Sequence, residues 1–183
     1  MTTLMIGGSG SGKSAYAEAY LSALSGDKKK YYLAAMQAYD EEGRARIERH
    51  RNMRAGKGFI TIEQPVRIQD AAMYMEAGEK TALLECVSNL AANEMFAGGG
   101  QRAEEAVTKE ITEGIAMLKE MLTHLVIVSN NVFEDGRVYD EGTMAYLRAM
   151  GRINQRLAAM ADEVVEVTAG IPIVIKAGAD GRT

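Results

Sequence analysis

The sequence predicts an α/β fold of three layers, in which helices cover both faces of a mainly parallel sheet. Short apolar segments typical of buried strands alternate along the chain with longer segments of helical periodicity. A glycine-rich loop follows the first of these strands. Later, two strands are separated only by Ala169 and Gly170. Because this connection is too short for a parallel crossover, we expect the last strand to run antiparallel at a sheet edge, where Pro172 is tolerated.

The expected elements alternate along the whole chain. Strands are predicted at residues 2–6, 31–36, 59–63, 81–86, 124–130, 163–168 and 171–175. Helices are predicted at residues 15–24, 40–54, 65–75, 102–122 and 143–161, the third of them opened by Pro65. Residues 26–30 form a polar turn, residues 98–100 a glycine loop, and residues 130–142 a polar loop long enough to cover a ligand. In such a sheet, ligands bind at the carboxyl ends of the strands.

The glycine-rich loop fits the phosphate-binding pattern G-x-x-x-x-G-K-[ST] at every fixed position. Glycines let backbone N–H groups turn inward around phosphate oxygens, the lysine reaches the β- and γ-phosphates, and the final hydroxyl can ligate Mg²⁺. A flexible linker is the alternative, but the strand before the loop and the helix after it argue against a linker. The sequence therefore predicts a P-loop NTPase-like domain. Its nucleotide-binding residues are Gly7, Gly8, Ser9, Gly10, Ser11, Gly12, Lys13 and Ser14.

A carboxylate follows the apolar run of the strand predicted at residues 81–86. P-loop enzymes hold an acidic residue associated with Mg²⁺ at this position, the carboxyl edge of a strand. Glu85 is therefore the candidate for the metal, together with Ser14. The alternative is that Glu85 only caps the helix that follows.

The helix predicted at residues 40–54 carries a histidine among arginines. Arg46, His50 and Arg54 are four residues apart and share one face of the helix. Neutral imidazole is a good nucleophile toward phosphorus, and neighbouring cations lower its pKa and keep it unprotonated at neutral pH. The alternative is an exposed basic helix that is stabilised by pairs such as Glu42 with Arg46.

Length and composition favour one cytoplasmic domain over residues 1–183. A formal net charge of −4 argues against a general nucleic-acid binder. Cys86 is the single cysteine of the sequence, which excludes an internal disulfide and fits a reducing compartment. We also expect no membrane span, because the chain has no long apolar run.

Several segments, in their order and spacing, resemble the bifunctional adenosylcobinamide kinase and adenosylcobinamide-phosphate guanylyltransferase family. The resemblance covers almost the whole chain. The segments are Gly7 to Ser14, Tyr32-Leu33-Ala34-Ala35-Met36-Gln37, Ala45-Arg46-Ile47-Glu48-Arg49-His50, Thr61-Ile62-Glu63, Leu83-Leu84-Glu85-Cys86 with Ser88-Asn89-Leu90, and Gly151-Arg152-Ile153-Asn154-Gln155-Arg156-Leu157-Ala158.

The resemblance implies two reactions in cobalamin assembly. The first phosphorylates the aminopropanol hydroxyl of adenosylcobinamide, and the second transfers GMP from GTP onto the resulting phosphate through a GMP–histidine intermediate. ATP, GTP and Mg²⁺ are the implied cofactors, and a homo-oligomer, a trimer, is the implied assembly. His50 matches the histidine, and Lys13 is the second catalytic residue. Further implied nucleotide contacts are Ala34, Ala35, Met36, Arg51, Arg54, Glu63 and Glu85.

The sequence departs from the family in residues 131–137. After the strand that ends at Asn130, the family continues with a glutamate, a Val-Gly pair and a Gly-Ile-Val-Pro-like turn, which this chain lacks. Two other functions therefore stay open at this point. One is a P-loop kinase for another small alcohol, and the other is a nucleotide-dependent regulatory module without group transfer.

Overall fold

The computed structural model describes residues 1–37, 41–131, 136–137 and 139–178 of the chain. Its centre is a seven-stranded sheet in the order β3-β2-β4-β5-β1-β6-β7. Neighbouring strands run parallel except β6 and β7, which are antiparallel, as the short connection between them predicts. The strands are β1 (Thr2–Ile6), β2 (Lys29–Ala34), β3 (Phe59–Glu63), β4 (Lys80–Glu85), β5 (His124–Val128), β6 (Glu163–Thr168) and β7 (Ile171–Lys176).

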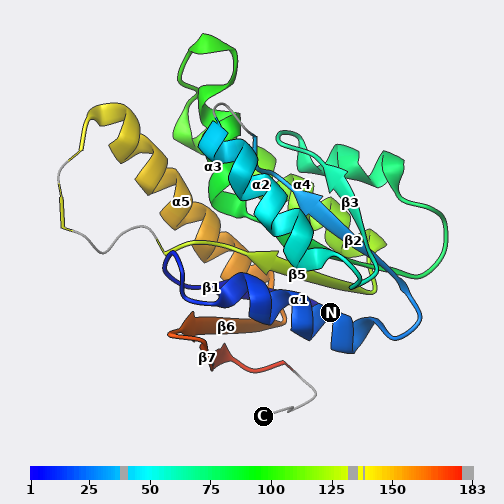
Figure 1. Cartoon of the computed structure of the whole chain (residues 1–183). Helices are drawn as coiled ribbons and strands as arrows, with labels where there is room; N and C mark the ends of the chain where they lie inside the picture. The colour runs from blue at the N-terminus through cyan, green and yellow to red at the C-terminus, as the bar shows by residue number, and fades with distance from the viewer. Residues whose placement is uncertain (38–40, 132–135, 138, 179–183) are drawn as a thin grey trace.

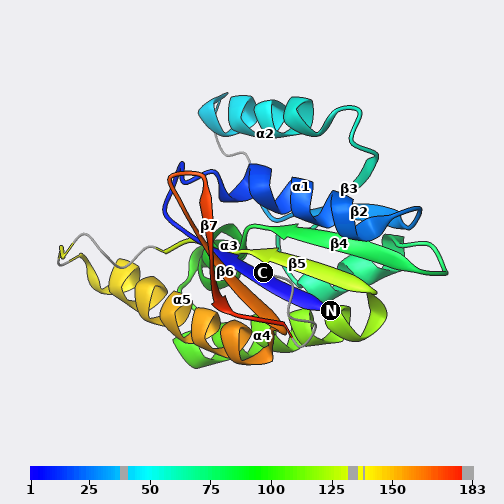
Figure 2. The same cartoon turned by 90° about the horizontal axis from the view of Figure 1, so that it is seen from below.

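Helices cover both faces of this sheet, so the expected α/β fold of three layers is confirmed (Figures 1 and 2). One face carries α1, with α2 lying outside it, and the other face carries α3, α4 and α5 (Figure 2). The helices are α1 (Lys13–Ser25), α2 (Glu41–Arg54), α3 (Val87–Phe96), α4 (Glu104–Met121) and α5 (Glu141–Met160), with short 3₁₀ helices η1 (Ile68–Tyr74) and η2 (Ala97–Gly99). No helix in the described ranges is long and apolar enough to cross a membrane.

Alternation along the strands creates two hydrophobic cores. In β2, Tyr31 and Leu33 join the large core under α3, α4 and α5. Tyr32, between them, joins the smaller core under α1. Because neighbouring strands are in parallel register, the same face of β3 and β4 as Tyr32 carries Thr61 and Leu83. Side chains on this face of the sheet, Tyr32 and Thr61 among them, line the candidate site described below.

Some predicted elements start at residues other than the observed ones. The strand β2 begins at Lys29, within the segment predicted as a polar turn. Pairing with Lys80 and Thr81 of β4 extends it, and the long side chain of Lys29 reaches out to Glu76. The other expected boundaries lie within about two residues of the observed ones for β1, β3, β4, β5 and α4.

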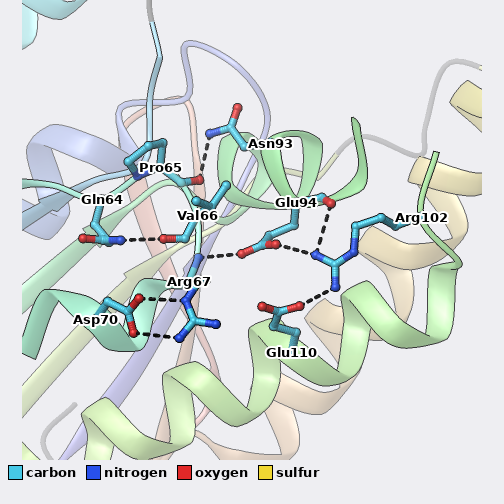
Figure 3. A network of polar contacts seen from close by, with 9 residues as sticks. All are labelled: Gln64, Pro65, Val66, Arg67, Asp70, Asn93, Glu94, Arg102 and Glu110. Atoms are coloured by element: carbon cyan, nitrogen blue, oxygen red, sulfur yellow. Dashed lines mark hydrogen bonds and ion pairs between the residues drawn. The ribbon is translucent and has the colours of Figure 1, made fainter. Parts of the chain in front are cut away.

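The helix expected at Pro65 is a correction, since helical structure begins only at Ile68 and is of the 3₁₀ type. Figure 3 shows that side chains of α3 bond to the backbone of this segment. Asn93 Nδ2 donates to the carbonyl of Pro65 at 2.9 Å, and the backbone N–H of Arg67 donates to Glu94 Oε1 at 2.6 Å. Arg67 itself has a left-handed backbone conformation, with φ of 48°.

Candidate nucleotide-binding site

The glycine-rich loop of residues 7–12 connects β1 to the start of α1, as its sequence pattern predicts. Gly7 passes so close to β6 that an added Cβ would lie 2.5 Å from the carbonyl oxygen of Val167. Gly12 precedes α1 with φ of 90°, a conformation that disfavours side chains. The first turn of α1 holds no acidic residue of its own, so the positive end of the helix dipole is not offset from within the helix. These features of the backbone are those of a phosphate-binding loop.

The turn between β6 and β7 supports this loop from the far end of the sequence. The N–H of Gly170 donates to the carbonyl of Ser11 at 2.8 Å, and the N–H of Asn131 donates to the carbonyl of Gly7 at 3.2 Å. These bonds shape the loop from outside it. The sequence carried no signal for them, because they join segments about 160 residues apart in the first case.

Lys13 opens α1 and is almost fully buried. Its Nζ donates to the carbonyl of Gly8 within the loop, at 3.0 Å. Burial lowers the pKa of Lys13 from its ordinary value, and the nearby Cys86 and Glu85 partly oppose this shift. The ammonium thus sits among the backbone groups that would surround phosphate oxygens, where charge is costly without an anion.

Ser14 and Glu85 meet at the carboxyl end of β4. The hydroxyl of Ser14 donates to Glu85 Oε1. Hydroxyl and carboxylate oxygens are the donors that suit Mg²⁺, which is commonly held by one or two protein oxygens together with substrate phosphates and water. No group of three or more His, Cys, Asp or Glu side chains with metal-binding geometry occurs within the described ranges. Ser14 and Glu85 supply only two protein oxygens, which fits a metal ion whose other ligands are nucleotide phosphates and water.

A pocket opens beside Glu85 on the α1 face of the sheet. Alternation explains it: Ala34 and Glu63 follow Tyr32 and Thr61 by two residues, so these four side chains share one face with Glu85. The end of α2 lies over this face. The residues that line the pocket are Tyr32, Ala34, Met36, Arg51, Arg54, Thr61, Glu63 and Glu85.

Two arginines of α2 give the pocket its charge. Arg51 pairs with Glu63 across the opening, and both side chains are more than half exposed. Arg54 is buried, and the carbon at the centre of its guanidinium lies 3.5 Å from the centroid of the Tyr32 ring. Its Nε and Nη1 are buried without a hydrogen-bond partner in the described part of the chain. Because buried donors are nearly always hydrogen-bonded, these two groups could bind an acceptor on a ligand.

Most of the expected nucleotide contacts therefore lie together. Ala34, Met36, Glu63 and Glu85 join the two arginines at the pocket, and Glu85 also reaches the phosphate loop through Ser14. Ala35 differs, since its side chain belongs to the opposite core. Its N–H donates to the Glu85 carbonyl and its own carbonyl accepts from Asn93, so protein groups occupy its backbone too.

Two expectations fall outside what the structure describes. Arg46 and His50 belong to α2, but their side chains lie outside the described residues. The same holds for residues 132–135 of the loop in which the sequence departs from the resembling family. Asn130, just before them, donates through Nδ2 to Ser88 Oγ at 2.6 Å.

Sequence reasoning missed Tyr32 and Thr61 as pocket residues. The available signal was the alternation of β2 and β3, because each of these residues lies two positions before an expected contact. A tyrosine inside an apolar run is typical of a core residue, so this pattern offered no reason to place Tyr32 at the pocket as well.

Comparison with known proteins adds to this geometry. The sequence profile described as "Cobinamide kinase / cobinamide phosphate guanyltransferase" matches residues 3–175. The chain is 35% identical to the bifunctional adenosylcobalamin biosynthesis protein CobU of Escherichia coli, over 96% of this chain and 100% of that protein. It is 28% identical to CobP, a bifunctional adenosylcobalamin biosynthesis protein of Pseudomonas aeruginosa, over 96% of this chain and 98% of that one.

Solved structures resemble the fold at much lower sequence identity. The flagellar accessory protein FlaH from Methanocaldococcus jannaschii matches 100% of this chain and 80% of its own, with a TM-score of 0.52 and 9% identity. A solved ATPase domain matches 90% of this chain and 68% of its own, with a TM-score of 0.51 and 10% identity. These two likenesses concern the fold alone.

Proposed function

Because the chain belongs to the cobinamide kinase and cobinamide phosphate guanylyltransferase family, we propose that it carries out both reactions on adenosylcobinamide, the second through a GMP intermediate on His50. One observation supports this proposal independently of the family. Glu85 contacts Ser14, directly after the phosphate loop, and also lines the pocket that holds Arg51 and Arg54. A nucleotide whose phosphates occupy the loop is therefore next to a pocket lined by two arginines and two glutamates.

In the kinase step, the hydroxyl of the substrate attacks the γ-phosphorus of a nucleoside triphosphate. The bond from that phosphorus to the bridging oxygen breaks, the nucleoside diphosphate leaves, and the hydroxyl proton passes to solvent. Lys13 and the loop N–H groups bind the charge that develops on the phosphate oxygens. Mg²⁺ at Ser14 and Glu85 would supply further charge neutralisation. We propose ATP or GTP as the phosphoryl donor.

In the guanylyl step, a neutral ring nitrogen of His50 attacks the α-phosphorus of GTP, and pyrophosphate leaves. A phosphate oxygen of the cobinamide phosphate then attacks the same phosphorus, the nitrogen–phosphorus bond breaks, and the imidazole is restored. His50 immediately precedes Arg51 and lies four residues, about one helical turn, before Arg54. Both arginines line the pocket, which supports a role for this turn of α2 at the α-phosphate.

Incubation with GTP labelled at the α-phosphate tests the intermediate. We expect a covalent GMP adduct that is stable in base and labile in acid, as phosphorus–nitrogen bonds to histidine are. The adduct should persist in His124→Ala, because His124 lies at the start of β5, the end of that strand away from the phosphate loop. It should vanish in His50→Ala. Labelling of His50→Ala would refute the intermediate.

Product analysis separates the whole proposal from its alternatives. With adenosylcobinamide and nucleotide, we expect cobinamide phosphate followed by the GDP derivative. A kinase for another alcohol would leave adenosylcobinamide unchanged while phosphorylating its own substrate, and a regulatory module would yield neither product.

The assembly that we propose is a homo-oligomer, a trimer by family resemblance. The strand β7 supports it, because this edge strand exposes Ile171, Ile173, Val174 and Ile175 to about half or more. We further propose one nucleotide-binding domain over residues 1–183 and a cytoplasmic location. All seven strands join one sheet, and Cys86 is an unpaired, buried thiol.

A further inference from the structure

Tyr32 contacts two charged side chains of opposite sign that line the pocket. Its hydroxyl donates to Glu85 Oε2 at 2.9 Å. The face of its ring carries the guanidinium of Arg54 at 3.5 Å. The residue is 3% exposed, so it lies beneath these two groups. One buried side chain therefore joins the acidic and the basic side of the pocket.

The fold holds the Tyr32 ring in one orientation. In the sheet, Tyr32 lies between Thr61 of β3 and Leu83 of β4. The ring of Phe59 meets it edge to face, with centroids 6.1 Å apart and planes at 84°. Two rigid strands and a second ring therefore set the direction of the hydroxyl and the position of the ring face.

The hydrogen bonds of Glu85 show what this orientation achieves. One carboxylate oxygen accepts from Ser14 and the other from Tyr32, so the plane of the carboxylate is fixed while each oxygen keeps a lone pair. Burial raises the pKa of the Tyr32 hydroxyl well above its usual range, and Glu85 adds to this shift.

The contact with Arg54 has a matching effect. A guanidinium stacked on a ring is held by its face, which leaves its N–H groups free in the guanidinium plane. Nε and Nη1 of Arg54 have no hydrogen-bond partner among the described residues, although both are buried. The ring thus orients a cation whose donors remain available for a ligand oxygen.

We propose that Tyr32 is a positioning residue for the nucleotide: its hydroxyl orients Glu85 and its ring orients Arg54, without contact between Tyr32 and the reacting atoms. The proposal rests on the nucleotide-binding function proposed above. Its alternative is that Tyr32 only fills the core under α1, and the two readings predict different behaviour for matched variants.

Tyr31 offers the matched control. It is the neighbouring residue in β2, it is 1% exposed, and its hydroxyl accepts from the N–H of Glu76 at 3.0 Å. Its side chain belongs to the opposite core, away from the pocket. Tyr31→Phe and Tyr32→Phe therefore each delete one buried hydroxyl with one hydrogen bond, and only the second faces the pocket.

The measurement is the dissociation constant of the Mg²⁺ complex of α,β-methylene GTP, which binds without guanylyl transfer, by titration calorimetry. We expect Tyr32→Phe to raise this constant about 10-fold, the size of a lost hydrogen bond to a charged group. Tyr32→Leu, which also removes the ring face, should raise it further, by about 30-fold or more. Tyr31→Phe should leave the dissociation constant within about 2-fold of the wild-type value. This holds even if Tyr31→Phe and Tyr32→Phe change thermal unfolding equally.

A double-mutant cycle shows whether Tyr32 acts through Glu85. In a Glu85→Gln background, Tyr32→Phe should weaken binding by no more than about 2-fold, because the group that it positions is already altered. Equal weakening in both backgrounds, or wild-type affinity in Tyr32→Phe, would overturn the proposal. If Tyr32→Leu fails to fold, Tyr32→Phe still decides, since it keeps the ring.

The outcomes for this inference and for the proposed function are distinguishable. Binding coupled between Tyr32 and Glu85 in a protein that forms no GMP adduct would leave the positioning role intact and remove the His50 intermediate. A normal GMP adduct without coupling between Tyr32 and Glu85 would support the His50 intermediate and remove the positioning role of Tyr32.

Discussion

Glu85 is the residue at which the phosphate loop and the pocket meet. Its two carboxylate oxygens accept from Ser14 and Tyr32, which come from α1 and β2. The carboxylate sits at the end of β4, between β2 and β5 in the sheet. Local sequence placed Glu85 at a strand end and so made it a candidate, but Tyr32 as its partner depends on the register between β2 and β4, which no local pattern reveals.

At the same scale, Lys13 predicts a pH dependence of nucleotide binding. The pKa of Lys13 is lowered below 10.5 by burial, so the ammonium loses its proton earlier than an exposed lysine as pH rises. A bound phosphate favours the charged form. Affinity for a nucleotide should therefore be greatest below the pKa of free Lys13 and fall as pH rises through it. Calorimetric titrations between about pH 8 and 10 measure this, below the ordinary lysine range.

The control for this pH dependence is Lys13→Arg, whose guanidinium stays charged over the whole range. It should bind more weakly at about pH 8 and lose less affinity on going to about pH 10. Titration of the nucleotide itself is common to both proteins and cancels in the ratio of their constants. A ratio that does not change with pH would exclude Lys13 as the titrating group.

At the scale of elements, sequence patterns predicted most strands and helices, and the failures have physical causes. The strands β1 and β3 match the expected residues, because turn residues bound short apolar runs. The helix predicted from Pro65 was wrong, because this segment is held by Asn93 and Glu94 of α3 rather than by its own helical bonds. The expected site residues gather at one pocket, yet Ala35 faces away through strand alternation.

Two carboxylates that join elements should differ in their contribution to stability. Glu94 is buried and accepts from the N–H of Arg67 and from Arg102 (Figure 3). Glu104 joins α4 to Arg148 of α5, and its side chain is 21% exposed against 4% for Glu94. Glu94→Ala leaves two donors without their acceptor and should lower the free energy of unfolding by about 2–4 kcal/mol. Glu104→Ala, the matched deletion, should cost at most about 1 kcal/mol.

Urea denaturation at low and high salt measures both variants. Added salt should erase most of the Glu104→Ala effect, because exposed charges are screened, and leave most of the Glu94→Ala effect. Equal losses for the two variants would contradict the assigned roles.

At the scale of the whole molecule, the sheet has two edge strands: β3, in which Ile62 is buried and three residues are exposed, and β7. The helix α2 lies over the β2 and β3 side, and the turn after it is tied to α1, where Lys57 pairs with the buried Glu18 (Figure 2). The opposite edge strand, β7, has all its residues exposed. Single exposed apolar residues are ordinary, but a strand edge that combines unpaired backbone groups with isoleucines favours association.

The proposed trimer can be tested through this edge. By light scattering after size exclusion, wild-type protein should have about three times the chain mass of 19.8 kDa. Ile173→Asp combined with Ile175→Asp should shift the mass toward 19.8 kDa, because two charges would be buried without partners at the interface. Met117→Asp is the control, since Met117 is also exposed but lies on α4. A trimer that survives the double change would place the interface elsewhere.

The bond from Gly170 to Ser11 has a consequence for synthesis in the cell. The strand β1 and the phosphate loop leave the ribosome before their partners do, because β1 lies between β5 and β6 and the loop is braced by the turn before β7. The emerging polypeptide therefore cannot complete the backbone contacts of this loop until Gly170 has been translated. A chain truncated before Gly170 would keep the sequence of the phosphate loop but lose this hydrogen bond to it.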